Sequence, residues 1–449
     1  MPQTRQVRPE YAEMFRCIGS ACEDTCCQGW NVLIERGAYE KYQNLPAGPL
    51  RTLIDANILM TPETASAANG SGTANIARMR MTESNQCPLL STERLCQIQE
   101  EKGEAFLPYP CATYPRIVHF IGEAEERALA LSCPEAARLV LLNPNLMEPV
   151  KQFVLPVEGD DAREGLPWLP PSFWPIRELV LTLVQNRAYP LWQRLFLLGA
   201  FCRRQDAMAN GSLKRSASDF LGDFDAAVAP GTLQAAMETM PIDPAAQLDV
   251  VLQLAGLMLR RSNVRPRFVE CIEAFTRGIG NGPGATLESL TADYALAHDR
   301  FYAPFFVRHP HIMENYLINT IFRCQFPFGR EGMRKEASVS MTREFALLSA
   351  QFALMRGLLI GVAGFHREKF STEHVVHTVQ AASKHFEHHP EFLNLTHEFL
   401  VENGMDGARG LTILLRNPES TAVRPKSPAK VAPEWQEGRS ALVEKKVSV

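Results

Sequence analysis

The chain has 449 residues, of which 46% are hydrophobic and 21% are charged, with a formal net charge of −4. These proportions are typical of a soluble globular protein, so they exclude bulk disorder and a fibrous fold, and the charge provides no basic field for nucleic acid. The most apolar stretch, 352–365, contains Arg356 and falls short of the ~20 residues of a membrane span, and the start has no apolar signal-peptide core. We therefore expect a cytoplasmic protein without a membrane span, with room for two to four domains at roughly 100–200 residues each.

The cysteines are concentrated at the N-terminal end. Of eleven, only Cys202, Cys271 and Cys324 follow residue 133, and their apolar helical surroundings predict buried structural thiols. In a reducing compartment, the N-terminal concentration favours metal ligation over a disulfide framework. The candidate metal ligands are Cys17, Cys22, Cys26, Cys27, Cys87, Cys96, Cys111 and Cys133.

The first four candidates lie within eleven residues. If this segment is helical, Cys22 and Cys26 are four residues apart and share a face, while Cys27 points about 100° away. Gly19 permits a close turn that would bring Cys17 back towards them. Cys22 and Cys26 are therefore the first ligands that we expect.

The other four candidates are dispersed. Cys87 and Cys133 each precede a proline, and Pro134 suits the first turn of a helix that would have Cys133 at its N-cap. The helix N-terminus would favour the thiolate form there. Cys111 lies between two prolines, which predicts a rigid loop, and Cys96 follows a polar turn.

Structural zinc sites usually show two paired cysteine motifs, whereas dispersed ligands fit an iron–sulfur cluster at least as well, so the spacing leaves both metals open.

The remaining sequence predicts a mostly α fold in which a cysteine-rich region packs on a helical bundle. We expect a cysteine-rich metal-cluster region at 1–145 with a small-residue surface loop at 61–75, a proline-rich linker at 146–172, a helical domain at 173–415 and a disordered basic, proline-rich tail at 416–449. Strand-like alternation is scarce. Apolar residues recur at i, i+3 and i+4 and predict helices over 174–187, 192–204, 247–260, 266–275, 312–326 and 343–359.

Two further features of the helical domain have ordinary structural interpretations. The glycines between Gly278 and Gly284 resemble a nucleotide-binding loop, but a helical segment and not a strand precedes them, which predicts a helix-ending turn. Seven of the eleven histidines fall between His366 and His397. A solvated or capping role is expected for most of them, with substrate contact or an extra metal as the alternative.

The order and content of the cysteine motifs are similar to those of one known family. FRCIGSACEDTCCQGW, NQCPLLSTERLCQIQ, CATYPR and LSCPEAAR resemble, over residues 15–140, the flagellin lysine-N-methylase (FliB-like) family, and the tight cluster more distantly resembles zinc- or iron-chelating cysteine-cluster proteins. The resemblance implies methyl transfer from S-adenosylmethionine to lysine ε-amines of flagellin. It also implies a 4Fe–4S cluster held by N-terminal cysteines, with zinc as the alternative metal.

The residues themselves leave the chemistry open. Neither a dinucleotide-type glycine fingerprint after a strand nor a C-x3-C-x2-C run is visible, so a methylase here would be unconventional. Lysine titrates near pH ~10.4, so its amine must lose a proton before it can attack, and the sequence singles out no Glu or Tyr near the cluster as the base. The competing interpretations are a non-catalytic zinc- or iron-binding module and an iron–sulfur redox protein.

Overall fold

A computed structural model describes most of the chain, which divides into two compact units, Met1–Leu139 and Val140–Val449. The described residues are 6–7, 11–65, 74–121, 124–145, 173–213, 222–224, 226–228, 233–260, 264–329, 340–387 and 391–418. The predicted linker at 146–172 lies outside them, and so does the predicted tail at 416–449 apart from residues 416–418, where Arg416 is buried. The packing of the cysteine region on the bundle stays a prediction.

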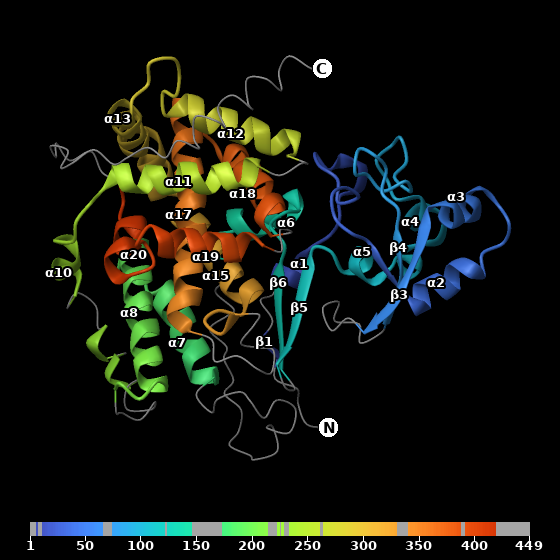
Figure 1. The fold of residues 1–449 in the computed structure, drawn as a ribbon, viewed down its shortest axis with the longest axis horizontal. Helices are drawn as coiled ribbons and strands as arrows, with labels where there is room; N and C mark the ends of the chain where they lie inside the picture. Colours follow the sequence, from blue (N-terminus) through green and yellow to red (C-terminus); the bar gives the residue numbers. More distant parts are fainter. Residues whose placement is uncertain are drawn as a thin grey trace. The chain divides into compact units, whose positions relative to one another are not determined.

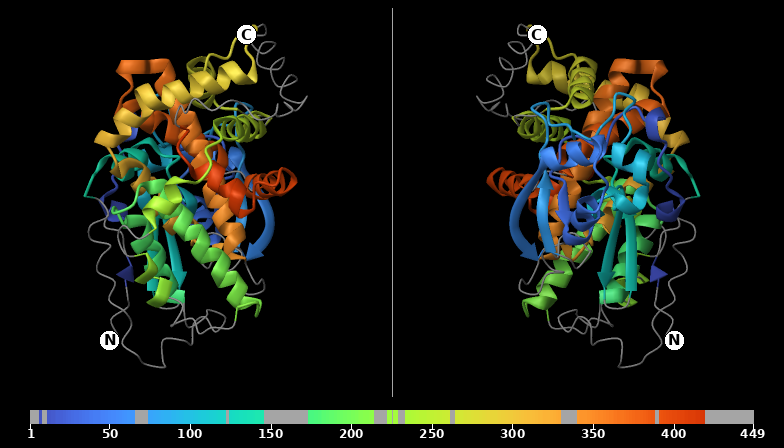
Figure 2. Two further views of the ribbon diagram at one scale, coloured as in Figure 1. Left: turned by 90° about the vertical axis from the view of Figure 1, so that its left-hand side faces the viewer. Right: turned by 90° about the vertical axis from the view of Figure 1, so that its right-hand side faces the viewer.

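The N-terminal unit contains two small sheets that the sequence did not predict. One is antiparallel in the order β2 (Leu33–Glu35), β4 (Ala74–Met79), β3 (Ile58–Ala65), and β3 and β4 are the long curved blue strands of Figure 2. The other has the order β1 (Gln6–Val7), β6 (Ala124–Leu129), β5 (Arg116–Ile121), with β1 parallel to β6 and β5 antiparallel to it.

The expectation of scarce strands is therefore wrong for this unit, and so is part of the loop predicted at 61–75. Residues 61–65 and 74–75 belong to β3 and β4. The register shifts between Met60 and Thr64, so the pairing is irregular there. Small, polar side chains on such a strand give no clean alternation, and the tertiary pairing outweighs local propensity.

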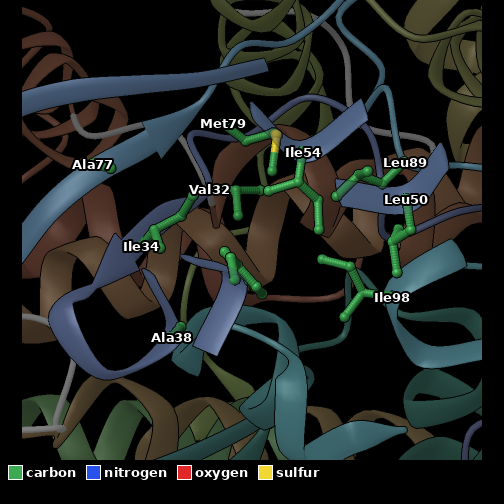
Figure 3. Close-up of a cluster of buried hydrophobic side chains, with 10 residues drawn as sticks. Val32, Ile34, Ala38, Leu50, Ile54, Ala77, Met79, Leu89 and Ile98 are labelled. Atoms are coloured by element: carbon green, nitrogen blue, oxygen red, sulfur yellow. The ribbon is translucent and has the colours of Figure 1, made fainter. Parts of the chain in front are cut away.

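Short helices complete the N-terminal unit around one hydrophobic cluster. They are α1 (Tyr11–Met14), α2 (Arg36–Gln43), α3 (Pro49–Asn57), α4 (Gln97–Lys102), α5 (Tyr109–Thr113) and α6 (Pro134–Leu142), whose last residues cross into the second unit. Ile34 and Ile54 are fully buried in the cluster that Figure 3 shows between the sheet and the helices. Each such aliphatic side chain contributes about 1.5–3 kcal/mol by burial. Cys87, Cys96 and Cys111 pack against this cluster, so the core fixes the segments that carry them.

The second unit is helical in its described residues, and the six helices that periodicity predicts are all present. They are α7 (Phe173–Gln185), α8 (Leu191–Ala209), α11 (Pro244–Leu259), α12 (Pro266–Gly278), α15 (His311–Cys324) and α17 (Met341–His366). The sequence did not single out α10 (Gln234–Glu238), α13 (Leu287–Ala297), the π-helix η6 (His298–Tyr302), α14 (Ala303–Arg308), α18 (Thr372–Phe386), α19 (Phe392–Glu402) or α20 (Ala408–Leu415). The glycines after α12 end that helix in a turn, as predicted, with Gly280 at a φ of +71° and Gly284 at +80°.

Helix α17 forms the core of the second unit. It runs through the middle of the helices in Figure 1, in orange, and every residue from Phe345 to Ala363 is buried. Among the described residues, Met341–Lys369 is the one segment long and apolar enough to cross a membrane, and its most apolar window is wholly buried inside the protein. A helix that is apolar on all sides and enclosed by other helices is a core helix.

Candidate metal centre

The first four candidate ligands lie on a loop that turns back on itself. The 3-10 turn η1 (Gly19–Ala21) begins at Gly19, whose φ of +56° favours glycine, so the predicted close turn is present. The Gly19 backbone N–H donates to Cys17 Sγ at 3.4 Å. This bond holds the Cys17 thiol over the turn that leads to Cys22.

The shared helical face predicted for Cys22 and Cys26 is wrong. Cys22 ends η1 in an extended conformation, and the residues from 23 to 27 form bends and not a helix. The reason is that side-chain oxygens accept hydrogen bonds from the backbone N–H groups of this segment. Asp24 Oδ1 accepts the Thr25 N–H at 2.8 Å, and Thr25 Oγ1 accepts the Cys27 N–H at 3.1 Å. Such local bonds compete with helix formation.

Backbone pairing brings the first cysteine segment to the second. The Cys87 N–H donates to the Cys27 carbonyl at 2.8 Å, and residues 28 and 86 form an antiparallel bridge beside it. Cys96 forms a further bridge with Leu90, which closes the loop that starts at Cys87. Segments that are far apart in the sequence are therefore held next to each other by main-chain bonds.

The last three candidates lie at or near helix starts. Cys96 is the N-cap residue of α4, and Cys133 directly precedes α6, as predicted. Cys111 is the third residue of α5, so the rigid loop predicted there is a short helix. Pro110 suits the first turn, because a first-turn residue needs no N–H to donate within the helix.

A helix N-terminus favours the thiolate form of a cysteine, but burial has the larger effect on the pKa of these two thiols. Burial raises the pKa of Cys133 to about 12, although the backbone N–H groups of Ala136 and Glu135 act in the opposite direction. Burial likewise raises the pKa of Cys96, against the N–H groups at the start of α4. Without a cation these buried thiols stay protonated at neutral pH.

Cys26, Cys87, Cys96 and Cys111 form a mutually interacting group, which we call the four-cysteine set. Burial and then the charges of Cys96, Cys87 and Cys26 raise the pKa of Cys111 well above its usual range. Burial, with Cys96 and Cys26, raises the pKa of Cys87 to about 11, and Cys26 also raises the pKa of Cys96. Each member is therefore close enough to the other three to influence their ionisation.

The remaining candidates interact with members of this set or with one another. The neighbouring Cys26 thiol and then burial raise the pKa of Cys27. Cys133 interacts with Cys22 and Cys26, and Cys22 interacts with Cys17. Every one of the eight predicted ligands thus interacts with at least one other, although they span more than a hundred residues.

The chemistry of this group fits a thiophilic metal. In the described part of the chain all eleven thiols are free, and no three His, Cys, Asp or Glu side chains are already arranged around a metal position. Most of these thiols are partly buried, whereas Cys17 and Cys26 are exposed. Crowded thiols that repel one another when ionised are stabilised as thiolates by a bound cation, which displaces their protons. Sulfur ligands select zinc or iron–sulfur clusters over magnesium or calcium. The assignment of the eight as metal ligands stays a prediction.

The three C-terminal cysteines are separate from this group. Cys202 on α8 and Cys271 on α12 are buried in the helical core, as predicted for structural thiols. Cys324, at the end of α15, is partly exposed and so is not the buried thiol that the sequence predicted.

The histidine-rich segment has structural roles in its described part. His374 lies in the first turn of α18, where its Nδ1 accepts the Ser371 N–H at 3.1 Å, so it has the predicted capping role. His366 stacks on His374 with ring centroids 3.6 Å apart, and the Arg265 N–H donates to buried His385 at 3.3 Å. His388 and His389 lie outside the described residues.

These observations define a mostly helical protein with a cysteine-rich N-terminal unit and a helical unit built around one buried helix. Residues 177–414, more than half of the chain, match the family model of the FliB lysine N-methylase C-terminal domain. The chain belongs to the FliB lysine N-methylase family. The matched range covers the helical unit from α7 to α20.

Individual relatives extend the similarity into the cysteine-rich unit. The chain is 22% identical over 422 residues to the lysine-N-methylase of Salmonella typhimurium strain LT2. This match covers 90% of this chain and 98% of that protein. The lysine-N-methylase of Salmonella choleraesuis matches equally. The flagellar biosynthetic protein FliU of Salmonella muenchen is 30% identical over 147 residues, 33% of this chain and 83% of that protein. No solved structure shows a significant match.

Proposed function

We propose that this protein is a cytoplasmic S-adenosylmethionine-dependent protein-lysine N-methyltransferase that acts on flagellin and carries a cysteine-bound 4Fe–4S cluster. Membership of the FliB lysine N-methylase family and the names of the relatives support the methyltransferase class and the flagellar substrate. The observation that carries the proposal is that the eight N-terminal cysteines each interact with at least one other within one unit of such a chain.

The four-cysteine set would supply the cluster ligands. A 4Fe–4S cluster takes four thiolates, and Cys26, Cys87, Cys96 and Cys111 all interact with one another. Cys27 also interacts with Cys26, Cys87 and Cys96 and is the alternative fourth ligand. Cys87, Cys96 and Cys111 pack against one hydrophobic core, and the backbone bond from Cys87 to Cys27 holds the segment of Cys26 next to that of Cys87. Cys17, Cys22, Cys27 and Cys133 would then lie around the cluster, where they could influence its charge.

The division of tasks follows from these positions. A bound cluster would supply redox or Lewis-acid chemistry near the N-terminal unit. The protein's own groups must bind the methyl donor and the substrate lysine, and must remove a proton from its ε-ammonium, because an ammonium nitrogen has no lone pair.

The test is anaerobic purification with iron, sulfide and zinc analysis, followed by incubation with radiolabelled S-adenosylmethionine and purified flagellin. We expect a brown protein with iron and sulfide that transfers label to flagellin lysines. A colourless zinc protein without transfer would instead support the non-catalytic metal module. A brown, redox-active protein without transfer would support the redox protein. Either of these two results would overturn the proposal.

A further inference from the structure

The helical unit contains a histidine–aspartate pair in an unusual helical turn. Helix α13, the five-residue π-helix η6 and helix α14 follow one another without a gap. Within η6, His298 Nδ1 lies 2.8 Å from Asp299 Oδ1. His298 is only 3% exposed, whereas the Asp299 side chain is 33% exposed. Single π-turns inside α-helices are frequent at functional sites, because they re-aim side chains at a cost in regular hydrogen bonding.

The pair lies against the core helix, in the neighbourhood of one fixed cation. Both α13 and η6 pack on α17, and α13 lies beside α17 in Figure 1. Arg356 of α17 is buried, and its guanidinium donates to the carbonyls of Leu414 and Leu415 at 2.6 Å each. Burial and the Arg356 charge lower the pKa of His298, while Asp299 raises it. His298 is therefore a neutral imidazole at neutral pH.

The position of Asp299 decides which ring nitrogen carries the proton. An ionised carboxylate accepts the Nδ1–H, which leaves the lone pair on Nε2. No residue in the described part of the chain forms a hydrogen bond with this Nε2. A neutral imidazole that is oriented by a carboxylate and has an unengaged nitrogen is the arrangement that general-base catalysis requires.

Aromatic rings continue from His298 along the same helix. The His298 and Tyr302 rings stack with centroids 5.5 Å apart, and Tyr302 stacks on Phe306 at 4.2 Å. Phe306 is partly exposed, and the stacked rings, which we call the aromatic wall, run from it to the buried imidazole. Ring faces attract ammonium cations within about 6 Å of the centroid. A lysine side chain is long and thin enough to reach a group one layer below the surface, and this wall would guide its charged end.

Two buried carboxylates of this unit, Glu314 and Glu387, are held by arginines. Glu314 accepts hydrogen bonds from Arg194 at 2.6 Å and from Arg187 at 2.8 Å, so both of its oxygens are held by cations. Glu387 faces Arg323 at 3.4 Å. These are structural ion pairs, and protonation of either carboxylate by a substrate would break a buried pair.

We propose that His298 is the base that removes the proton from the substrate lysine, with Asp299 as its positioning residue and Tyr302 and Phe306 as the wall for the ammonium. This inference rests on the proposed lysine methylation. One N–H proton passes from the ε-ammonium to Nε2 of His298, and the nitrogen keeps the electron pair. That pair forms the new N–CH3 bond as the carbon–sulfur bond of S-adenosylmethionine breaks, and its electrons stay on sulfur. The imidazolium then returns its proton to solvent.

The test compares His298→Asn with His309→Asn in the full-length, cluster-loaded protein. Asparagine keeps a donor for Asp299 but cannot accept a proton. His309 stacks on Phe305 with ring centroids 4.4 Å apart, without a carboxylate partner, and so serves as the matched histidine. We expect H298N to lose about 10²–10⁴-fold in kcat at neutral pH with little change in KM. Added imidazole and higher pH should restore part of this loss, while H309N should keep wild-type kcat.

Nitrogen NMR of ring-labelled histidine provides a readout that is independent of activity. The histidine signal that is present in wild type and absent in H298N belongs to His298. That signal should show a protonated Nδ1 and an unprotonated Nε2. The opposite tautomer or a wild-type kcat in H298N would overturn the assignment. A loss of kcat that added imidazole does not restore, together with a lower Tm, would also overturn it. A loaded wild-type protein that transfers no methyl group would overturn the proposed function itself, and this inference with it.

Discussion

Cys26 is the residue through which most of the N-terminal thiols interact. It influences the ionisation of Cys27, Cys87, Cys96, Cys111 and Cys133. Sequence spacing predicted Cys26 as a metal ligand, which stays a prediction, and the helical face that it was expected to share with Cys22 is absent. Its partners come from distant segments, and spacing cannot specify a contact that main-chain pairing and a common core produce.

Replacing Cys26 with Ser should abolish metal retention, because a hydroxyl is a poor substitute for a thiolate on iron or zinc. Cys324→Ser is the matched control, since Cys324 is partly exposed and lies in the other unit. Metal content after anaerobic purification and desalting measures the effect. Equal metal in the two variants would refute the assignment of Cys26.

Cys271 should make stability depend on pH in the alkaline range. Burial raises its pKa from 9.0 to about 12. The folded state therefore keeps the proton that the unfolded state releases above pH 9.0, and stability falls as the pH rises from 9.0 towards 12. The loss should be about 1.4 kcal/mol per pH unit in that window.

Urea unfolding of wild type and Cys271→Ala over this range isolates the contribution of this thiol. The variant should be less stable at about pH 8 because it loses a buried side chain, but its stability should decline less steeply above about pH 9. Parallel curves for the two proteins would contradict a buried, protonated Cys271.

At the scale of elements, α12 and α17 cross at a point where only glycine fits. A Cβ on Gly361 would overlap the Phe275 ring and lie 2.7 Å from the Phe275 carbonyl oxygen, and a Cβ on Gly278 would overlap the Gly361 carbonyl. The backbones therefore touch, and the helical unit depends on this contact for the position of its core helix.

Gly361→Ala should destabilise the protein by about 1–3 kcal/mol, because a methyl group there forces the two helices apart. Gly256→Ala on α11 is the control, since a Cβ added at that position would meet nothing within 4 Å. That control should gain about 0.5–1 kcal/mol from better helix propensity. Thermal melts of both measure the difference, and a G361A protein as stable as wild type would exclude a close crossing.

Helices were predictable from the sequence, and strands were not. Six helices in the second unit carry regular apolar spacing, and α17 could be recognised even though it is buried on all sides. The strands β3 and β4 lack alternation because their pairing is irregular. The His298–Asp299 pair could have been noticed as adjacent acid–base residues, but only the π-turn and the packing on α17 distinguish it from an exposed pair.

At the scale of the whole molecule, the two compact units differ in content. The N-terminal unit gathers thiols from segments up to residue 133, and the helical unit holds the family's C-terminal domain around a rigid core. The family was correctly predicted from the cysteine motifs. The choice of the four thiols that we propose as cluster ligands, and of the group that we propose as a base, depended on the three-dimensional structure.

The most direct measurement is the intact mass of flagellin after incubation with S-adenosylmethionine and the loaded protein, as wild type, C26S or C324S. We predict mass increments of whole methyl groups on lysines with wild type and with C324S, and unmodified flagellin with C26S. Unmodified flagellin with a wild-type protein whose metal is verified, or equal methylation by C26S, would contradict the account.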